Sequence, residues 1–269
     1  SLSIFRDDAL AGRKACSTGG GSGISKGIAQ AFLAHGAEVA IVGRNAERLA
    51  AAADELSQAS GKRCLPFAAD VREPALVEAA IDGAIAALGP LDVVVNGAAG
   101  NFLCPAAQLS YNGFRTVIAI DSLGTFNVTR AAFDKSLRDA AEAGKRPSIL
   151  NISATLHHGA TPLQIHASAA KAAVDAMTRN LALEWGPLGI RVNGIAPGPI
   201  AETEGMSRLA PGDDLTKKYE AAIPLGRFGR IDEIASLAVF LTSDAASLIT
   251  GETVIADGGA CLGQMPLNL

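Results

Sequence analysis

Short apolar segments alternate along the chain with longer segments in which apolar residues recur every three or four positions. The longer segments include 24–35, 46–60 and 75–88, and their spacing predicts helices. A glycine follows each of them, as expected where a helix ends in a left-handed residue. The short segments have the length and apolar content of buried strands. The predicted strands are 14–18, 38–43, 63–68, 92–96, 148–152, 191–195 and 253–256.

The order of these segments predicts the fold class. A strand, a helix and a further strand repeat in steps of about 30 residues, which is typical of βαβ units and a parallel sheet covered on both faces. We therefore expect an α/β protein with one doubly wound, Rossmann-type sheet of about seven strands. The chain contains no internal repeat and no low-complexity linker, so we expect 1–269 to be a single domain. The long irregular stretch 197–223 predicts a substrate lid.

The composition excludes several classes of protein. Hydrophobic residues make up 49% of the chain and charged residues 19%, which is too apolar for a disordered chain. The net charge is −4 and no run of Lys and Arg occurs, so we expect no nucleic-acid partner. No apolar stretch reaches about 18 residues, the length required to span a membrane.

The cysteine and histidine positions argue against a disulfide framework and a metal site. The four cysteines are widely separated and form no CxxC pair. His157, His158 and His166 surround one predicted strand, but no carboxylate or cysteine stands beside them at metal-ligand spacing. We therefore expect no metal.

A glycine-rich segment, Thr18-Gly19-Gly20-Gly21-Ser22-Gly23-Ile24, connects the first predicted strand to the first predicted helix. Glycines there allow a sharp turn and a close approach of a pyrophosphate, and the helix N-terminus offers free N–H groups to the phosphates. A plain turn is the alternative, but the position after the first strand of a βαβ series favours dinucleotide binding. The expected contacts are Gly19, Gly21, Ser22, Gly23 and Ile24.

The end of the second predicted strand indicates which dinucleotide binds. A site for NAD usually has Asp or Glu at this point to hold the ribose 2′-hydroxyl. Here the strand ends in Gly43-Arg44-Asn45, and Arg48 follows one turn later. Guanidinium groups suit a 2′-phosphate, so we expect NADPH/NADP rather than NAD, the alternative being two solvated arginines.

Several further motifs resemble the short-chain dehydrogenase/reductase family over nearly the whole chain: Asp70-Val71, Asn96-Gly97-Ala98-Ala99-Gly100, Lys171 and Pro197-Gly198. The resemblance implies that Asp70 and Val71 lie at the adenine and that Lys171 holds the nicotinamide ribose. It also implies a homotetramer. Ser25 departs from the family, which usually has a glycine there. The remaining cofactor residues implied by the resemblance are Asn96, Ala98, Gly100, Pro197, Gly198, Ile200 and Thr203.

The residues that usually carry this family's carbonyl chemistry are missing. The family uses Tyr-x-x-x-Lys with a Ser 13 residues before the Tyr, and the phenol donates a proton to the carbonyl oxygen. Here the Tyr position is Ala167 and the Ser position is Ala154, and neither side chain can transfer a proton. The two tyrosines of the chain, Tyr111 and Tyr219, lie elsewhere in the sequence. We therefore expect either a silent binding protein or an enzyme that reduces something other than a simple carbonyl.

Reduction of a conjugated C=C of a thioester fits the second possibility, because it needs an oxyanion stabiliser and an acid acting through water. The sequence resembles one subgroup with this activity, the 2,4-dienoyl-CoA reductases of the peroxisomal type. The resemblance rests on the strings 98–105, 121–128, 171–179 and 196–200 and on Leu156, where the mitochondrial type has Tyr. It implies an NADPH-dependent reductase in β-oxidation of unsaturated fatty acids that forms trans-3-enoyl-CoA.

The same resemblance implies roles for individual residues. Asp121 and Lys171 are the expected catalytic pair, which orders a water that protonates the dienolate near the α-carbon. The alternative for Asp121 is a buried acid with a structural role. The residues expected to bind the acyl-CoA substrate are Arg72, Phe102, Ser110, Tyr111, Asn112 and Arg208. The alternative for each of the two arginines is a surface charge without a role in binding.

Two other functions stay open at this point. One is another oxidoreductase of acyl thioesters, such as a 3-ketoacyl reductase with a displaced acid, and the other is a catalytically silent NADP-binding protein. The last four residues, Pro266-Leu267-Asn268-Leu269, are not a Ser-Lys-Leu signal. We expect a cytoplasmic location if the protein is bacterial, with the peroxisome as the alternative.

Overall fold

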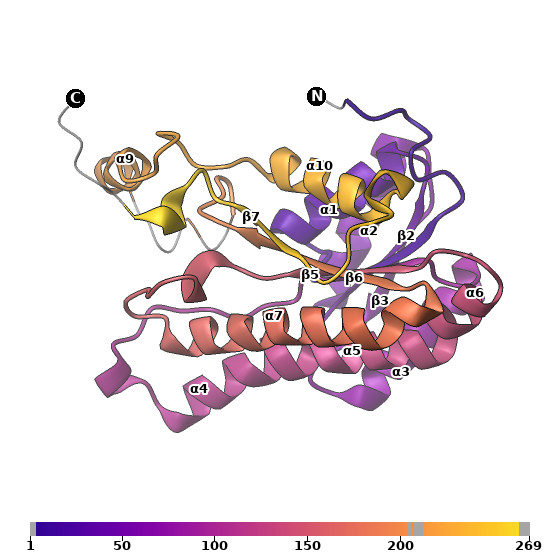
Figure 1. The fold of residues 1–269 in the computed structure, drawn as a ribbon, viewed down its shortest axis with the longest axis horizontal. Helices are drawn as coiled ribbons and strands as arrows, with labels where there is room; N and C mark the ends of the chain where they lie inside the picture. Colours follow the sequence, from indigo (N-terminus) through magenta and orange to yellow (C-terminus); the bar gives the residue numbers. More distant parts are fainter. Residues whose placement is uncertain (1–3, 204–205, 207–211, 264–269) are drawn as a thin grey trace.

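Seven parallel strands form one sheet in the order β3-β2-β1-β4-β5-β6-β7 (Figure 1). The computed structural model describes residues 4–203, 206 and 212–263. All seven predicted strands are present, with ends that differ from the prediction by at most two residues. The strands are β1 (Lys14–Thr18), β2 (Glu38–Gly43), β3 (Cys64–Ala68), β4 (Val93–Asn96), β5 (Ser148–Ile152), β6 (Arg191–Pro197) and β7 (Thr253–Ala256).

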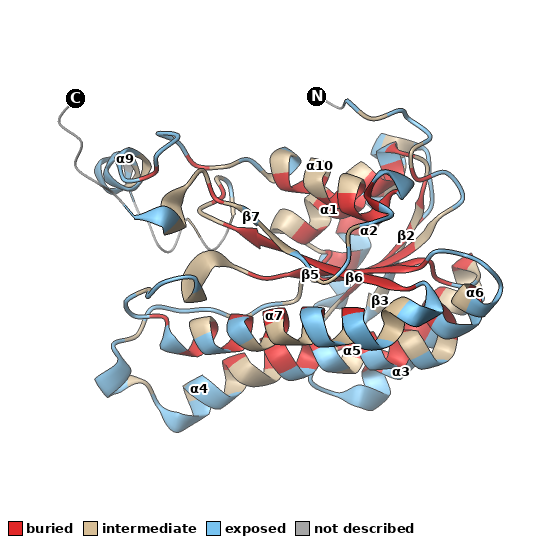
Figure 2. Cartoon of the chain, in the orientation of Figure 1, coloured by how far each residue is buried: buried red, intermediate tan, exposed pale blue. Residues whose placement is uncertain are grey.

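Helices cover both faces of the sheet and enclose two apolar layers (Figures 1 and 2). One layer lies under α1, α2 and α10, with Phe32, Leu49 and Ile234 at its centre. The other lies under α3, α5 and α7 and includes Ile81 and Val128. The helices are α1 (Gly23–Ala34), α2 (Ala46–Ser60), α3 (Pro74–Leu88), α4 (Tyr111–Ile118), α5 (Gly124–Ala132), α6 (Arg138–Glu142), α7 (Ile165–Trp185), α9 (Asp213–Ala221) and α10 (Ile231–Thr242).

Local residue chemistry explains the ends of the helices. Asn45 accepts the backbone N–H of Arg48 at the start of α2, and Pro74 occupies the first turn of α3. Gly61 ends α2 in the left-handed conformation, as the sequence predicted. None of the helices in the described ranges is long and apolar enough to cross a membrane.

The helical stretch from α4 to α6 is interrupted twice by π-helical turns, at Ala119–Leu123 and Phe133–Leu137. Such turns are rare and occur frequently at functional sites, because the extra residue changes the direction of the side chains that follow. The first of them carries Asp121, which is buried. Helical periodicity in the sequence does not reveal this interruption.

The segment 197–223 is less irregular than the sequence indicated. It contains α9, so the prediction of a stretch without secondary structure is wrong for Asp213–Ala221. Ile223 and Phe228 form a small separate apolar cluster with Ala201 and Met206. This cluster holds the described part of the segment next to the end of β6.

Candidate active site

A cavity of about 1320 Å³ opens at the carboxyl ends of the strands, where β1 and β4 are neighbours and the direction of strand order reverses. Parallel α/β sheets bind their ligands at this point. The glycine-rich segment after β1 forms one wall. The segment after β5, the π-turn with Asp121 and the start of α7 form another, and α9 contributes Tyr219.

The glycine-rich segment has the shape needed for a dinucleotide. Gly19 has φ +71°, and a Cβ at this position would lie 2.8 Å from the carbonyl oxygen of Gly97, so only glycine fits. The Ser22 side chain makes no cap hydrogen bond at the start of α1. The first N–H groups of this helix therefore face the cavity without a side-chain cap, which suits a pyrophosphate.

The residues expected to select the dinucleotide lie in the same cavity. Arg44 and Arg48 line it at the end of β2, together with Asp70 and Val71 after β3. Asp70 accepts hydrogen bonds from Arg72, with Nη2 at 2.6 Å from Oδ2, and these hydrogen bonds lower the pKa of Asp70. The positive charge of Arg44 lowers that pKa further. Of the other predicted cofactor residues, the cavity wall includes Gly21, Gly23, Ile24, Ala98, Pro197, Gly198, Ile200 and Thr203.

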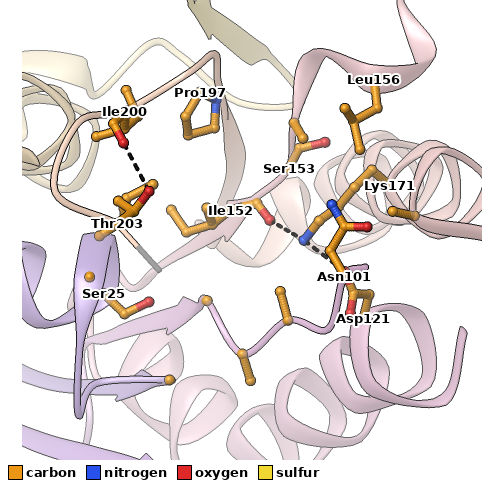
Figure 3. Close-up of a pocket in the computed structure, with 18 of the residues that line it drawn as sticks. Ser25, Asn101, Asp121, Ile152, Ser153, Leu156, Lys171, Pro197, Ile200 and Thr203 are labelled. Carbon is orange, nitrogen blue, oxygen red and sulfur yellow. Dashed lines mark hydrogen bonds and ion pairs between the residues drawn. The ribbon is translucent and has the colours of Figure 1, made fainter. Parts of the chain in front are cut away.

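Asp121 and Lys171 meet at the centre of the opposite wall (Figure 3). Lys171 Nζ lies 3.3 Å from Asp121 Oδ2 and donates a hydrogen bond to the carbonyl oxygen of Ile152 at 2.8 Å. Asp121 Oδ1 accepts the backbone N–H of Gly100 at 2.7 Å. Both charged side chains are buried, and each is held by a further backbone hydrogen bond. The pair is therefore fixed in place and faces the cavity.

The structure also places the missing tyrosine and serine positions at the cavity. Ala154 and Ala167 both line the wall near Lys171 and offer no acid. Tyr111 is 93% exposed and lies away from the cavity wall. Tyr219 on α9 does line the cavity, so a phenol is present there that was not predicted from the sequence.

Sequence reasoning missed two amide side chains in this site. Asn101 and Gln164 line the cavity, and Asn101 Nδ2 donates to Gln164 Oε1 at 2.5 Å. Figure 3 shows Asn101 near Asp121 and Lys171. Amide groups in such a place can hydrogen bond to a carbonyl oxygen of a substrate. The Asn101 position lies within a family-like string, but the direction of its side chain depends on the fold of the segment after β4.

Other predicted site residues lie outside the cavity wall. Asn96 is buried beneath it, where it donates to Thr129 and Asn151, and Gly100 contributes its backbone N–H to Asp121. Phe102 stacks on His166 at a ring distance of 4.3 Å. Ser110 caps α4, and Tyr111 and Asn112 are exposed in its first turn. Arg72 is half-exposed and paired with Asp70, and Arg208 lies outside the described residues.

The histidines after β5 have a carboxylate neighbour that their sequence spacing did not suggest. Oδ2 of Asp175, on α7, lies 2.6 Å from Nε2 of His157 and 3.9 Å from Nε2 of His158. The prediction that no carboxylate lies at a metal-ligand distance from these histidines is therefore wrong for the folded chain. The contact arises because α7 packs against the segment that follows β5.

Comparison with known proteins identifies the family. A family model described as enoyl-(acyl carrier protein) reductase matches residues 19–261. The chain is 48% identical to a Danio rerio protein named peroxisomal 2,4-dienoyl-CoA reductase, (3E)-enoyl-CoA-producing, over 96% of this chain and 85% of the relative. It is 41% identical to a Bacillus subtilis protein named probable 2,4-dienoyl-CoA reductase, (2E)-enoyl-CoA-producing, over 93% of this chain and 96% of the relative. The chain belongs to the short-chain dehydrogenase/reductase family.

Solved structures agree with this assignment. A short-chain dehydrogenase from Bacillus anthracis superimposes with a TM-score of 0.83 at 41% identity, covering 94% of this chain and 98% of that one. A Burkholderia cenocepacia gluconate 5-dehydrogenase, solved in complex with NADP and tartrate, gives a TM-score of 0.87 at 31% identity, covering 96% and 99%. A Brucella melitensis 3-ketoacyl-(acyl-carrier-protein) reductase, solved with NADH, gives 0.85 at 32%, covering 94% and 99%. The chain is therefore an oxidoreductase that uses a nicotinamide cofactor.

Proposed function

We propose that this protein is an NADPH-dependent 2,4-dienoyl-CoA reductase that produces trans-3-enoyl-CoA and acts in β-oxidation of unsaturated fatty acids. The observation that carries the proposal is the buried pair of Asp121 and Lys171, in a site where the usual tyrosine and serine are both alanine. A family member built in this way cannot protonate a carbonyl oxygen with the usual phenol. The names of the relatives at 41% and 48% identity support the same substrate class.

When bound, the reduced dinucleotide supplies a hydride to C5 of the dienoyl thioester. The C4=C5 electron pair then moves to C3=C4, the C2=C3 pair moves to C1=C2, and negative charge collects on the thioester oxygen. Asn101 and Gln164 supply hydrogen-bonding groups near this oxygen. A water held by Asp121 and Lys171 protonates C2, which leaves the remaining double bond at C3=C4.

The proposed cofactor is NADPH because two arginines, and no acid, line the cavity at the end of β2. Arg44 and Arg48 would hold the 2′-phosphate. Arg72 is half-exposed beside the cavity, so its guanidinium can pair with Asp70 and still reach a phosphate of CoA. The substrate roles of Phe102, Ser110, Tyr111, Asn112 and Arg208, the homotetramer and the cellular location stay predictions.

The direct test mixes the protein with NADPH and 2,4-hexadienoyl-CoA and follows the loss of absorbance at 340 nm. We expect consumption of NADPH, and NMR of the product should show the double bond at C3. A double bond at C2 would mean that C4 receives the proton, which would contradict the proposed position of the acid.

Consumption of NADPH with a 3-ketoacyl-CoA but not with the dienoyl-CoA would replace the proposal with a ketoreductase, in which Tyr219 is the phenol available in the cavity. Binding of NADPH without turnover of either substrate would indicate a silent family member.

A further inference from the structure

Three side chains converge beside the active site without being part of it. His157 and His158 follow β5, at the end of the short helical turn Thr155–His157, and Asp175 lies on α7. His157 Nε2 is 2.6 Å from Asp175 Oδ2, and His158 Nε2 is 3.9 Å from the same oxygen. One ligand atom from each residue lies within 4.8 Å of the other two.

The buried carboxylate of Asp175 requires a positive charge close to it. The Asp175 side chain is only 5% exposed, and in the part of the chain that the structure describes no Lys or Arg lies within 4.0 Å of it. Its other oxygen accepts a hydrogen bond from Thr253 on β7 at 3.3 Å. A buried carboxylate is costly unless a cation compensates it. The cation can be a protonated imidazole or a metal ion.

The presence of two imidazoles distinguishes these possibilities. The rings of His157 and His158 lie 4.6 Å apart and face one carboxylate. Nε2 of His157 and Nε2 of His158 both lie within 4.0 Å of the same oxygen of Asp175, so both imidazoles can share one ion with it. A divalent metal uses both rings in their neutral form together with the carboxylate.

We propose that His157, His158 and Asp175 bind a zinc-class divalent cation. Two imidazoles and one carboxylate suit zinc and its first-row neighbours better than calcium or magnesium, which prefer oxygen ligands. Ligand atoms around a tetrahedral zinc lie about 3.3 Å apart, and the observed separations from the Asp175 oxygen bracket this value. His158 is partly exposed, so an ion can enter from solvent and keep a water as its fourth ligand.

The proposed ion would link the turn Thr155–His157 to α7 and, through Asp175, to β7 beside the active-site cavity. The turn Thr155–His157 carries Thr155 and Leu156, which line the active-site cavity. The Asp175 carboxylate connects this turn to α7 and, through Thr253, to β7. The proposed role is therefore structural: the metal fixes one wall of the cavity and takes no part in hydride or proton transfer.

The test is zinc binding by untagged, chelator-stripped protein, measured by titration against a chromophoric chelator. We expect one zinc per chain, and a Tm that rises by about 5 °C or more when zinc exceeds its Kd about 100-fold. D175N and H158Q should each weaken binding at least about 100-fold, since loss of an outer-shell partner alone costs 10- to 100-fold. The side chain of His158 is more exposed than that of Asp175, so H158Q is the variant expected to preserve the fold, and circular dichroism checks both.

Two control variants exclude other ligands. H35Q removes a distant histidine, and C104S/C261S removes the two half-buried thiols. Both should bind zinc as the native protein does. The proposal is overturned if native protein binds no zinc, if binding survives in H158Q, or if it is lost in C104S/C261S.

Discussion

Lys171 and Asp121 form an ion pair of 3.3 Å inside the cavity, and each side chain has a second, backbone partner that fixes its direction. The lysine comes from the second turn of the long helix α7, and the aspartate comes from the π-helical turn Ala119–Leu123. Because each charged group has a buried counter-charge, removing either one leaves the other uncompensated. Under the proposed function, a change at either residue therefore affects local structure as well as catalysis.

The first prediction concerns this pair. D121N keeps the shape of the side chain but cannot hold a water as an acid–base partner, so kcat with 2,4-hexadienoyl-CoA should fall at least about 100-fold. Y219F should keep most of the activity, because the proposed proton donor is the water at Asp121 and not the phenol on α9. D134N, which changes an exposed aspartate on a neighbouring segment, serves as the structural control. Activity retained in D121N, or lost in Y219F, would reverse the assignment of the acid.

Cofactor selection gives the second prediction. R44A/R48A should lower kcat/KM for NADPH relative to that for NADH at least about 100-fold, since charge-assisted hydrogen bonds to a 2′-phosphate are each worth about 1.5–3 kcal/mol. R63A removes an exposed arginine that precedes β3 and pairs with Glu38 at the start of β2, and it should leave the ratio unchanged. Steady-state kinetics with both cofactors measure it. An equal loss with NADPH and NADH would show that these arginines do not select the phosphate.

The third prediction concerns the serine that replaces the family's glycine. Ser25 is buried on α1, and a Cβ added at Gly97 would lie 2.0 Å from its Oγ. G97A should therefore destabilise the fold by about 1–3 kcal/mol, as overpacking of a filled site does. S25A removes the oxygen that a side chain at position 97 would meet, so S25A/G97A should recover about 1 kcal/mol or more in a double-mutant cycle from urea unfolding. Additive effects of the two changes on the free energy of unfolding would show that the Ser25 hydroxyl does not exclude a side chain at position 97.

The fourth prediction is a dependence of stability on pH. Glu233 in the first turn of α10 accepts hydrogen bonds from Arg227 and from the backbone of Arg230, and the Arg227 bonds lower its pKa from 4.5 to about 2. A lowered folded-state pKa means that the stabilisation is complete above about pH 4.5 and is lost as the pH falls towards 2. The pair is partly exposed, so E233Q should cost about 1 kcal/mol at pH 7.

Urea unfolding at pH 7, 4.5 and 2.5 measures this effect. The difference between the native protein and E233Q should shrink as the pH falls. The exposed pair of Asp134 and Arg130 provides the comparison, with D134N expected to change stability by less at pH 7. A difference that stays constant down to pH 2.5 would contradict the cause assigned to the lowered pKa.

Much of the fold was predictable because the signals are local. The apolar strands are buried on both faces and therefore appear as continuous apolar runs, and Gly61 and Pro74 mark helix ends through their own backbone preferences. The glycine-rich segment and the two arginines at the end of β2 occupy fixed places in a βαβ unit, so their positions in the cavity also followed from the sequence.

Other features depend on contacts between distant segments. The α9 helix was missed because the prolines, glycines and charges around it resemble a loop. Asn101, Gln164 and Tyr219 enter the cavity only through the packing of their segments, and Asp175 reaches the two histidines across 18 residues of chain. No periodicity or spacing in the sequence encodes these approaches.

Local sequence patterns predict the parallel α/β architecture, the dinucleotide end of the site and the absence of the usual catalytic tyrosine, because each depends on residue type at a position within one local pattern. Contacts between distant segments turn Asp121 towards Lys171 and bring two amides into the same cavity. The reason is that a π-helical turn and the packing of α7 set the directions of these side chains, and both arise from contacts made after the chain has folded.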